Sequence, residues 1–407
     1  MSTSQLSVER ELDRGAQISI INLIDALIEN ANQLRASDIH IDPMQNTVRI
    51  RMRIDGVLHD RYTLPRTIHP EVISRIKVMT GLRTDEHQSV QDGRFRHVFP
   101  DTEKVIDVRV SMAPTYWGGN VVLRLLSDNV ENFTLETMGF SQSDQKKILH
   151  ALKSQSGMIL ATGPTGSGKT TTLYALIKML NSVESSIVTI EDPIEYTVDG
   201  IRQIQVNPRA GLTFANGLRS ILRQDPDIIM VGEIRDAETA SIAVNTALTG
   251  HLLLSTLHTN DAATTLPRLL DMKIESYLVA STVNIAIGQR LVRRICNACR
   301  TTIPMDKALR ENIALLPVPT TLKKSPVFYQ GEGCTECAGS GYSGRLSINE
   351  VLVADDEIRA AILQRAPSSE LKRIAVSKGV TTLLEDGLRK AYLGETTLQE
   401  VLRVVHE

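Results

Sequence analysis

The sequence predicts an α/β protein, with a strand-rich first domain followed by a nucleotide-binding domain that has a parallel sheet. Three observations predict this fold: an alternating apolar pattern near the start, short apolar runs separated by helical stretches, and a glycine-rich loop after the first run. At 407 residues the chain is long enough for roughly two to three domains of about 150 residues. Its 42% hydrophobic content can cover a sizeable core, which excludes disorder and fibrous structure.

The first domain is predicted over 18–127, after a flexible N-terminus of residues 1–17. Apolar side chains at helical spacing predict an amphipathic helix over 18–31. Apolar residues then alternate with arginines over 48–54, and Asp55-Gly56 predicts a two-residue hairpin turn. Further strands are expected at 105–110 and 121–126, and a linker at 128–140.

The second domain is predicted over 141–295, because its hydrophobic pattern changes. Strands that are apolar on both faces and alternate with helices indicate a parallel sheet. A small irregular module is expected at 296–345, which holds the cysteines and is rich in Gly and Pro, and 346–407 is expected to be a helical C-terminal subdomain. The four predicted strands are 158–161, 187–190, 228–231 and 252–254.

Overall charge and hydropathy exclude several classes of protein. Lys plus Arg (45) nearly balance Asp plus Glu (47), so no global positive field recruits nucleic acid or anionic lipid. The N-terminus lacks the apolar core of a signal peptide, and no apolar stretch approaches the roughly 20 residues of a membrane span. We therefore expect an unexported protein without a membrane span.

A phosphate loop is the strongest motif. GPTGSGKT, residues 163–170, fits the pattern G-x-x-x-x-G-K-[ST] between an apolar strand and a helix. Glycines let backbone N–H groups close around phosphate oxygens, Lys169 reaches the β and γ phosphates, and Thr170 would bind magnesium. The alternative, a glycine-rich turn with a chance lysine, is disfavoured by the flanking elements. The predicted nucleotide-binding residues here are Gly163, Pro164, Thr165, Gly166, Ser167, Gly168, Lys169, Thr170 and Thr171.

An acidic box follows the second strand of this domain. In TIEDPIEY, residues 189–196, the carboxylates of Glu191, Asp192 and Glu195 crowd a strand end, where ligands bind in open α/β folds. One of these carboxylates could orient the water that attacks the γ-phosphate. A solvated acidic loop is the alternative interpretation.

Glu233 is the candidate acid after the third strand, facing magnesium or the attacking water. It follows Gly232, where phosphate-loop enzymes usually have an aspartate, so this is a variant of the second nucleotide motif. Arg219, Arg223 and Arg235 surround it in the sequence. Isolated arginines are more often surface ion-pair partners, which is the alternative for these three.

Two histidines bracket the fourth strand in TGHLLLSTLHTND, residues 249–261. His251 precedes the apolar run and His258 follows it. A lone histidine is usually structural, but a pair in these places suggests a sensor or communication role.

All four cysteines fall into two Cys-x-x-Cys pairs, Cys296 with Cys299 and Cys334 with Cys337. The spacing is compatible with two knuckles that fold around one tetrahedral zinc ion. No open ligand position is implied, so the zinc would be structural. Redox dithiols and inert buried cysteines are the alternatives.

In this order the motifs resemble the ATPase superfamily of type II secretion and type IV pilus systems. The similarity spans roughly residues 18–405 and implies a PAS-like α+β first domain and a RecA-like second domain. GYSGR (341–345) after the paired cysteines resembles the type II secretion and pilus-extension branch, because the retraction ATPases lack the zinc module. The remaining motifs that carry the resemblance are SDIHID (37–42), RIDGVL (53–58), QDGR (91–94) and LRQDPDIIMVGEIRD (222–236).

The resemblance also implies roles for individual residues. The family's loop lysine falls on Lys169, its catalytic acidic-box glutamate on Glu195 and its second-motif glutamate on Glu233. Lys273 stands where the family usually has glycine. The histidine-box residues are His251 and His258, and the arginines that reach the nucleotide are Arg109, Arg124, Arg219 and Arg223.

Arg109 and Arg124 belong to the first domain and are expected to act when it closes over the nucleotide. Guanidinium groups at the γ-phosphate are worth roughly a thousandfold or more in arginine-finger enzymes. The alternative is that both arginines pair with acids on the sheet surface.

The resemblance implies a homohexameric, magnesium-dependent ATPase that drives assembly of pilin-like filaments. We expect a cytoplasmic protein that reaches the inner membrane indirectly, through a platform protein and a membrane-anchored recruiting protein. Secretion ATPases usually carry a further N-terminal domain for recruitment, whereas 36 residues precede Ser37 here.

Type II secretion is the favoured function and pilus extension is the alternative. A DNA-translocating ATPase is disfavoured by the near-zero net charge, and no nucleic-acid partner is expected. A nucleotide-binding scaffold without turnover is disfavoured because Lys169, Thr170 and the candidate carboxylates are all present.

Overall fold

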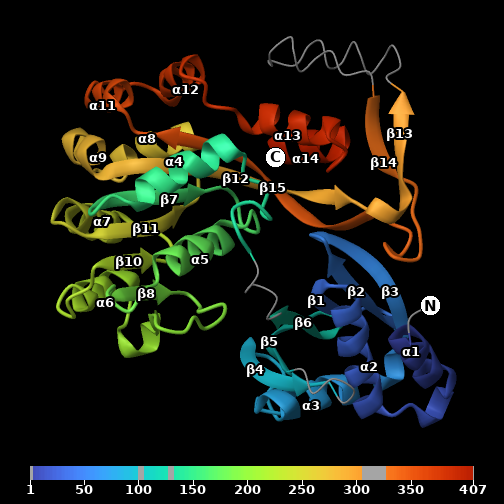
Figure 1. The fold of residues 1–407 in the computed structure, drawn as a ribbon. Coiled ribbons are helices and arrows are strands. Elements are labelled where there is room, and N and C mark those ends of the chain that lie inside the picture. Colours follow the sequence, from blue (N-terminus) through green and yellow to red (C-terminus); the bar gives the residue numbers. More distant parts are fainter. Residues whose placement is uncertain (1–2, 100–104, 127–132, 305–326, 407) are drawn as a thin grey trace. The chain divides into compact units, whose positions relative to one another are not determined.

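The computed structural model describes residues 3–99, 105–126, 133–304 and 327–406 (Figure 1). The chain forms two compact units, one of residues 1–131 and 333–342 and the other of residues 132–332 and 343–407. The start of the predicted linker lies outside the described residues. Leu135, Met138 and Phe140, which the prediction places in the linker, are buried in a core of the second unit. Among the described residues, no helix is long and apolar enough to cross a membrane.

The first unit contains a six-stranded antiparallel sheet with the order β3-β2-β1-β6-β5-β4 (Figure 1). The predicted helix is present as α2 (Ile20–Gln33), and the Ser19 side chain caps it by accepting a hydrogen bond from Asn22 N. The predicted hairpin turn is confirmed, because Asp55 and Gly56 have φ angles of 48° and 89°. The strands are β1 (Ala36–Pro43), β2 (Thr47–Ile54), β3 (Val57–Pro65), β4 (Gln91–Val98), β5 (Val105–Thr115) and β6 (Gly118–Leu126), and helix α3 is His69–Thr80.

The N-terminal segment, expected to be flexible, contains helix α1 (Thr3–Asp13). Val8 is fully buried in the core of the first unit. The Glu11 carboxylate accepts a hydrogen bond from Ser19 N at 3.2 Å and pairs with Arg14 at 2.9 Å. This polar segment has weak helical periodicity, so tertiary contacts stabilise the helix more than its own sequence does.

The second unit contains a seven-stranded sheet with the order β15-β12-β7-β11-β10-β8-β9 (Figure 1). Neighbouring strands from β12 to β9 run parallel, and the four predicted strands lie side by side at its centre. The predicted α/β fold is therefore confirmed. The strands are β7 (Gly157–Thr162), β8 (Ile187–Glu191), β9 (Arg202–Gln205), β10 (Ile228–Val231), β11 (Leu252–Leu257), β12 (Val283–Ile295) and β15 (Tyr342–Val353).

Helices cover both faces of this sheet. Successive residues of β7 belong to different cores: Met158 and Leu160 pack with residues of α6 to α9, whereas Ile159 and Ala161 pack with residues of α4 and α5. This arrangement explains why the strands are apolar on both faces. The helices are α4 (Gln142–Leu152), α5 (Lys169–Leu180), α6 (Phe214–Ile221), α7 (Ala237–Leu248), α8 (Ala262–Asp271) and α9 (Ser276–Thr282).

The C-terminal part combines a small sheet with helices. β13 (Arg300–Pro304) and β14 (Val327–Gly331) form an antiparallel pair within the segment that was expected to be irregular. Residues 305–326 of that segment lie outside the described residues. After β15 the chain forms α11 (Asp356–Leu363), α12 (Ser368–Ser377), α13 (Leu383–Tyr392) and α14 (Leu398–His406).

Candidate active site

The phosphate loop connects β7 to α5 at the carboxyl edge of the parallel sheet. Gly163, Gly166 and Gly168 have φ angles of 148°, 78° and 89°, which strongly favour glycine. A Cβ atom on Gly163 would lie 2.4 Å from the carbonyl oxygen of Gln289 and 2.5 Å from Ser167 Oγ. Glycine is therefore required where the loop passes over the middle of β12.

Lys169 lies beneath this loop and is 7% exposed. Its Nζ donates hydrogen bonds to the carbonyl oxygens of Gly163 and Pro164, both at 2.9 Å. Burial lowers the pKa of Lys169 to about 8, although the nearby Glu233 carboxylate raises it. The ammonium is thus a desolvated cation that is held by two carbonyl groups.

The residues of the loop fit a bound phosphate. Ser167 Oγ is buried and has no hydrogen-bond partner among the described residues, and a buried hydroxyl group without a partner is costly. The backbone N–H groups at the start of α5 add the positive potential of a helix N-terminus. Thr170 lies exposed in the first turn of α5, where a hydroxyl group could bind magnesium.

Glu233 follows β10 and is 8% exposed. Its Oε1 pairs with Arg235 at 2.6 Å, and its Oε2 lies 3.3 Å from His258 Nε2. The strand register places the ends of β7, β10 and β11 together, because Leu257 is opposite Thr162 and Ser255 is opposite Val231. The structure therefore brings together the lysine, the glutamate and one histidine of the prediction.

The acidic box separates into buried and more exposed carboxylates. Glu191 is 2% exposed and accepts hydrogen bonds from the Tyr174 hydroxyl group, Thr189 Oγ1 and Gln203 Nε2. It anchors the end of β8. The hydrogen bond with Glu233 raises the pKa of Arg235, and the exposed Asp192 carboxylate adds to this, so Asp192 lies near the Glu233 cluster. Glu195 is half-buried.

The two histidines lie at opposite edges of the sheet. His258 is at the carboxyl edge with Glu233, whereas the backbone oxygen of His251 accepts a hydrogen bond from Gly157 N at the start of β7. The His251 ring lies 3.2 Å from the carbonyl oxygen of Thr246. A buried strand separates them, so within one chain the structure does not bring His251 to the phosphate loop.

Arg219 and Arg223 lie on and just after α6, on the surface of the second unit. Arg219 pairs with Glu238 at 2.8 Å, and Arg223 donates to the carbonyl oxygen of Arg219 at 2.9 Å. The pair of Arg219 with Glu238 is a surface ion pair, which is the alternative role that the sequence analysis gave for this arginine. Both partners of that ion pair are largely exposed, at 46% and 62%.

Arg109 and Arg124 are directly opposite each other on β5 and β6 of the first unit. Arg94 is opposite Arg109, and Asp38 joins the same row because it is opposite both Arg124 and Arg53. We call these five residues the arginine row. Asp38 is 4% exposed and holds Arg124 at 2.9 Å, as the alternative interpretation expected for this arginine.

Two polar residues of β12 complete the surroundings of the loop, and the sequence analysis missed them. Gln289 is 1% exposed and accepts a hydrogen bond from Thr172 at 2.7 Å. Arg290 is 7% exposed and donates to the carbonyl oxygen of Asn260 at 2.7 Å. The sequence feature that could have identified them is the polar pair Gln289-Arg290 inside the apolar stretch NIAIGQRLV, residues 284–292.

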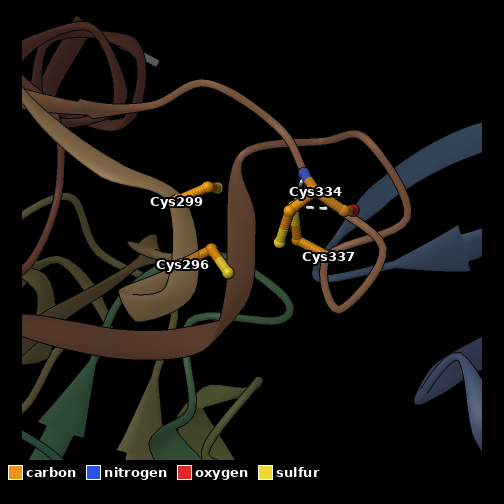
Figure 2. A group of neighbouring side chains, drawn as sticks. All are labelled: Cys296, Cys299, Cys334 and Cys337. Carbon is orange, nitrogen blue, oxygen red and sulfur yellow. Dashed lines mark hydrogen bonds between the residues drawn. The ribbon is translucent and has the colours of Figure 1, made fainter.

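The four cysteines form a separate site (Figure 2). Their sulfur atoms all lie within 4.8 Å of one another, and none forms a disulfide. The Cys334 and Cys337 sulfur atoms are 3.7 Å apart. Sulfur atoms bound to one tetrahedral zinc ion at about 2.3 Å would be about 3.8 Å apart. The Cys337 sulfur also accepts hydrogen bonds from the backbone N–H groups of Cys334 and Gly341, which favour a thiolate.

The family of type II/IV secretion system proteins matches residues 13–403. The chain belongs to this family. It is 44% identical over 408 residues to a type II secretion system protein E of Xanthomonas campestris, an alignment that covers all of this chain and 71% of that protein. It is 45% identical over 392 residues to the type IV pilus assembly ATPase PilB of Thermus thermophilus, covering 96% of this chain and 43% of that protein.

Solved structures are similar over nearly the whole chain. The ATPase DotB of Legionella pneumophila superposes with a TM-score of 0.68 at 24% identity, covering 94% of this chain and 95% of that one. The pilus retraction motor PilT, solved with ADP, gives a TM-score of 0.63 at 25% identity over 94% and 96%. The predicted resemblance to secretion ATPases is therefore confirmed. The chain is an ATPase of this family in the type II secretion branch, and the pilus assembly ATPases are the alternative branch.

Proposed function

We propose that this chain hydrolyses magnesium ATP at the carboxyl edge of its parallel sheet and that turnover powers pseudopilus assembly for type II secretion. The observation that carries the proposal is the gathering of Lys169, Ser167 and Glu233 around a loop that only glycines can form. ATP supplies the phosphoanhydride bond, and magnesium would neutralise its phosphate charge.

The chain's own residues then have distinct roles. Lys169 exchanges its two carbonyl partners for phosphate oxygens, and Ser167 gains the partner that its hydroxyl group lacks. The Thr170 hydroxyl group binds magnesium. Glu233 polarises the attacking water or faces magnesium, and His258 orients this carboxylate from 3.3 Å. Glu195 and the neighbouring Asp192 are the further acidic-box candidates for positioning the water.

The arginines and His251 act outside this cluster in the proposal. Arg109 and Arg124 would neutralise charge that develops on the γ-phosphate in the transition state. Arg219 and Arg223 would contact the nucleotide from the second unit, and His251 would communicate the nucleotide state. Within the second unit, Arg219 is held in a surface ion pair and His251 lies at the edge of the sheet opposite the phosphate loop. Their roles therefore need rearrangement or a neighbouring subunit, which supports a homohexameric assembly.

We also propose that Cys296, Cys299, Cys334 and Cys337 bind one structural zinc ion as thiolates. The clustered sulfur atoms and the N–H donors to the Cys337 sulfur support this. Four protein ligands fill a tetrahedral shell, so the ion would stabilise the module without taking part in hydrolysis.

The proposed setting is the cytoplasmic side of the inner membrane. The chain would reach it through a platform protein and a membrane-anchored recruiting protein, and its membrane contact would be indirect. No nucleic-acid partner is proposed, because the net charge is −2. Pilus extension is the second candidate, favoured by the 45% identity to the pilus assembly ATPase of Thermus thermophilus.

A chromosomal Glu233→Gln substitution in the source organism tests the proposal and separates the candidates. Loss of exported proteins with normal pili supports type II secretion. Loss of pili with normal export supports the pilus candidate. Normal export and normal pili, together with unchanged ATP hydrolysis by the purified variant, would contradict the motor assignment itself. Glu184→Gln, an exposed acid before β8, is the matched control.

A further inference from the structure

The first unit contains a cavity that none of the predicted site residues lines. Its volume is about 520 Å³, and it lies between α3, the segment that connects α3 to β4, and the β5–β6 hairpin. Ile73, Met112 and Pro114 form part of its wall. This volume lies within the range of about 300–1,000 Å³ that small-molecule sites occupy.

Two cations line the cavity without a carboxylate partner. Lys77 is 3% exposed, and its Nζ donates to the carbonyl oxygen of Glu86. Arg66 donates from Nη2 to the carbonyl oxygen of Trp117, whereas its Nη1 is buried and has no partner among the described residues. Neither cation forms an ion pair within the described part of the chain. A buried cation without a counter-ion is costly, so an anion there would be stabilised.

Glu86 also lines the cavity, but its carboxylate and that of nearby Asp85 have other partners. The Glu86 carboxylate accepts hydrogen bonds from Gln88 N at 2.7 Å and Ser89 N at 3.1 Å. Asp85 pairs with Arg83 at 2.8 Å, outside the cavity lining. Burial lowers the pKa of His69, and its Nε2 lies 3.0 Å from the carbonyl oxygen of Gly119. Arg66 and Lys77 are the arginine and the lysine of the cavity lining, and they carry its permanent positive charge.

A glycine lets the hairpin approach these cations. Gly118 has a φ angle of 110°. A Cβ atom there would lie 3.2 Å from the His69 ring and 3.4 Å from Arg66 Nη2. The wall of the cavity beside the guanidinium thus depends on a residue without a side chain.

We propose that this cavity binds a small organic phosphate, of the size of a sugar phosphate. A guanidinium fork with a free Nη1 and an ammonium suit the several oxygens of a phosphate group. The apolar wall leaves room for the body of the ligand. The site is distinct from the phosphate loop, and its occupant is a ligand rather than the substrate of hydrolysis.

The single tryptophan of the chain reports on this cavity. Trp117 precedes Gly118, which lines the cavity, and its carbonyl oxygen accepts from Arg66. Titration of the whole protein with ribose 5-phosphate should give a saturable change in tryptophan fluorescence and a calorimetric binding signal. Ribose without the phosphate should give neither. Arg66→Gln and Lys77→Met should each weaken binding by about tenfold or more, because each removes a charge-assisted contact.

Matched variants decide where the probe binds. Arg83→Gln removes a nearby exposed charge that does not line the cavity, so its affinity should equal that of the wild type. Lys169→Ala should also leave this binding unchanged. Loss of binding in Lys169→Ala with normal binding in Arg66→Gln would place the probe at the phosphate loop and overturn the proposal. Absence of any calorimetric signal with wild-type protein would overturn it as well. If Lys77→Met does not fold, the half-buried Arg66 position still provides the test.

Discussion

The carboxyl edge of the parallel sheet in the second unit and the arginine row of the first unit both contain cationic side chains. These side chains differ greatly in how much of them is exposed to solvent. Lys169 is 7% exposed and is held by two carbonyl groups, whereas the Arg124 side chain is 59% exposed and is held by one aspartate. A buried cation acts in a low-dielectric site, where its field is strong before the ligand arrives. An exposed arginine keeps its hydration, so it contributes strongly only after water is excluded.

The comparison teaches that the two regions should contribute to different steps. The buried lysine should matter for binding the nucleotide, because it is already in place. The row should matter for turnover, because its charge becomes effective only in a closed, dry arrangement. Variants that separate binding from turnover can break or sharpen this distinction.

The largest effect is expected for Lys169→Ala. The change removes the buried charge beneath the loop, so ATP binding should weaken strongly and hydrolysis should fall by more than about 10³-fold. Calorimetry with ATP and a phosphate-release assay measure the two quantities. Lys153→Ala, an exposed position after α4, is the control. Near-normal ATP affinity in Lys169→Ala would break the comparison.

A double substitution, Arg109→Ala with Arg124→Ala, should reduce hydrolysis by about 10³-fold while ATP affinity stays close to normal. The expected split follows mainly from the exposure of Arg124, which adds little before closure, whereas Arg109 is half-buried. Arg96→Ala removes a neighbouring exposed arginine outside the row and should change little. Full turnover in the double variant would show that the row has no part in hydrolysis.

Glu233→Gln should retain ATP binding and lose about 10²-fold in turnover. The amide keeps the size of the side chain but cannot act as a carboxylate toward water or magnesium. Single-turnover and steady-state rates of purified protein measure this effect. Turnover equal to that of the Glu184→Gln control would remove Glu233 from the mechanism.

The effect of pH on ATP affinity should be smaller than the effects of these substitutions, at about tenfold per pH unit. The pKa of Lys169 is lowered to about 8, so the free protein loses this charge as pH rises through about 8. Bound phosphate favours the charged form, and ATP affinity should therefore decrease above about pH 8. In the Lys169→Arg variant the guanidinium stays charged, so its affinity for ATP should not change with pH over the same range. A flat wild-type profile would contradict the prediction.

Cys299→Ser should have the smallest effect on the nucleotide, with less than about a twofold change in ATP affinity. It should reduce the zinc content, measured by elemental analysis, and increase proteolysis within residues 296–345. Thr335→Ala in the second cysteine loop leaves all four sulfur atoms and is the control. A full zinc content in Cys299→Ser, or zinc-free wild-type protein, would argue against the metal site.

Local patterns in the sequence predicted the central strands, the phosphate loop and the cysteine pairs, because each depends on neighbouring residues. The contacts of Glu233 with His258, and of Gln289 with Thr172 of α5, depend on strand register across the sheet. The opposite placement of His251 and His258 follows from their positions before and after β11, and the sequence already indicated it. Helix α1 was missed because its stability comes from packing on the rest of the unit rather than from its own periodicity.

Strand β12 has three attachments along its length. Gln289 contacts α5 through Thr172, Arg293 pairs with the 2%-exposed Glu400 of α14 at 2.7 Å, and the strand ends one residue before Cys296. Seven residues of strand span about 23 Å at roughly 3.3 Å each. An extended strand that is hydrogen-bonded to a sheet hardly stretches. β12 is therefore a stiff element that is fixed near its far end by α14 and by the cysteine module. A displacement of the phosphate loop along the axis of β12 would be transmitted to the cysteines with little loss.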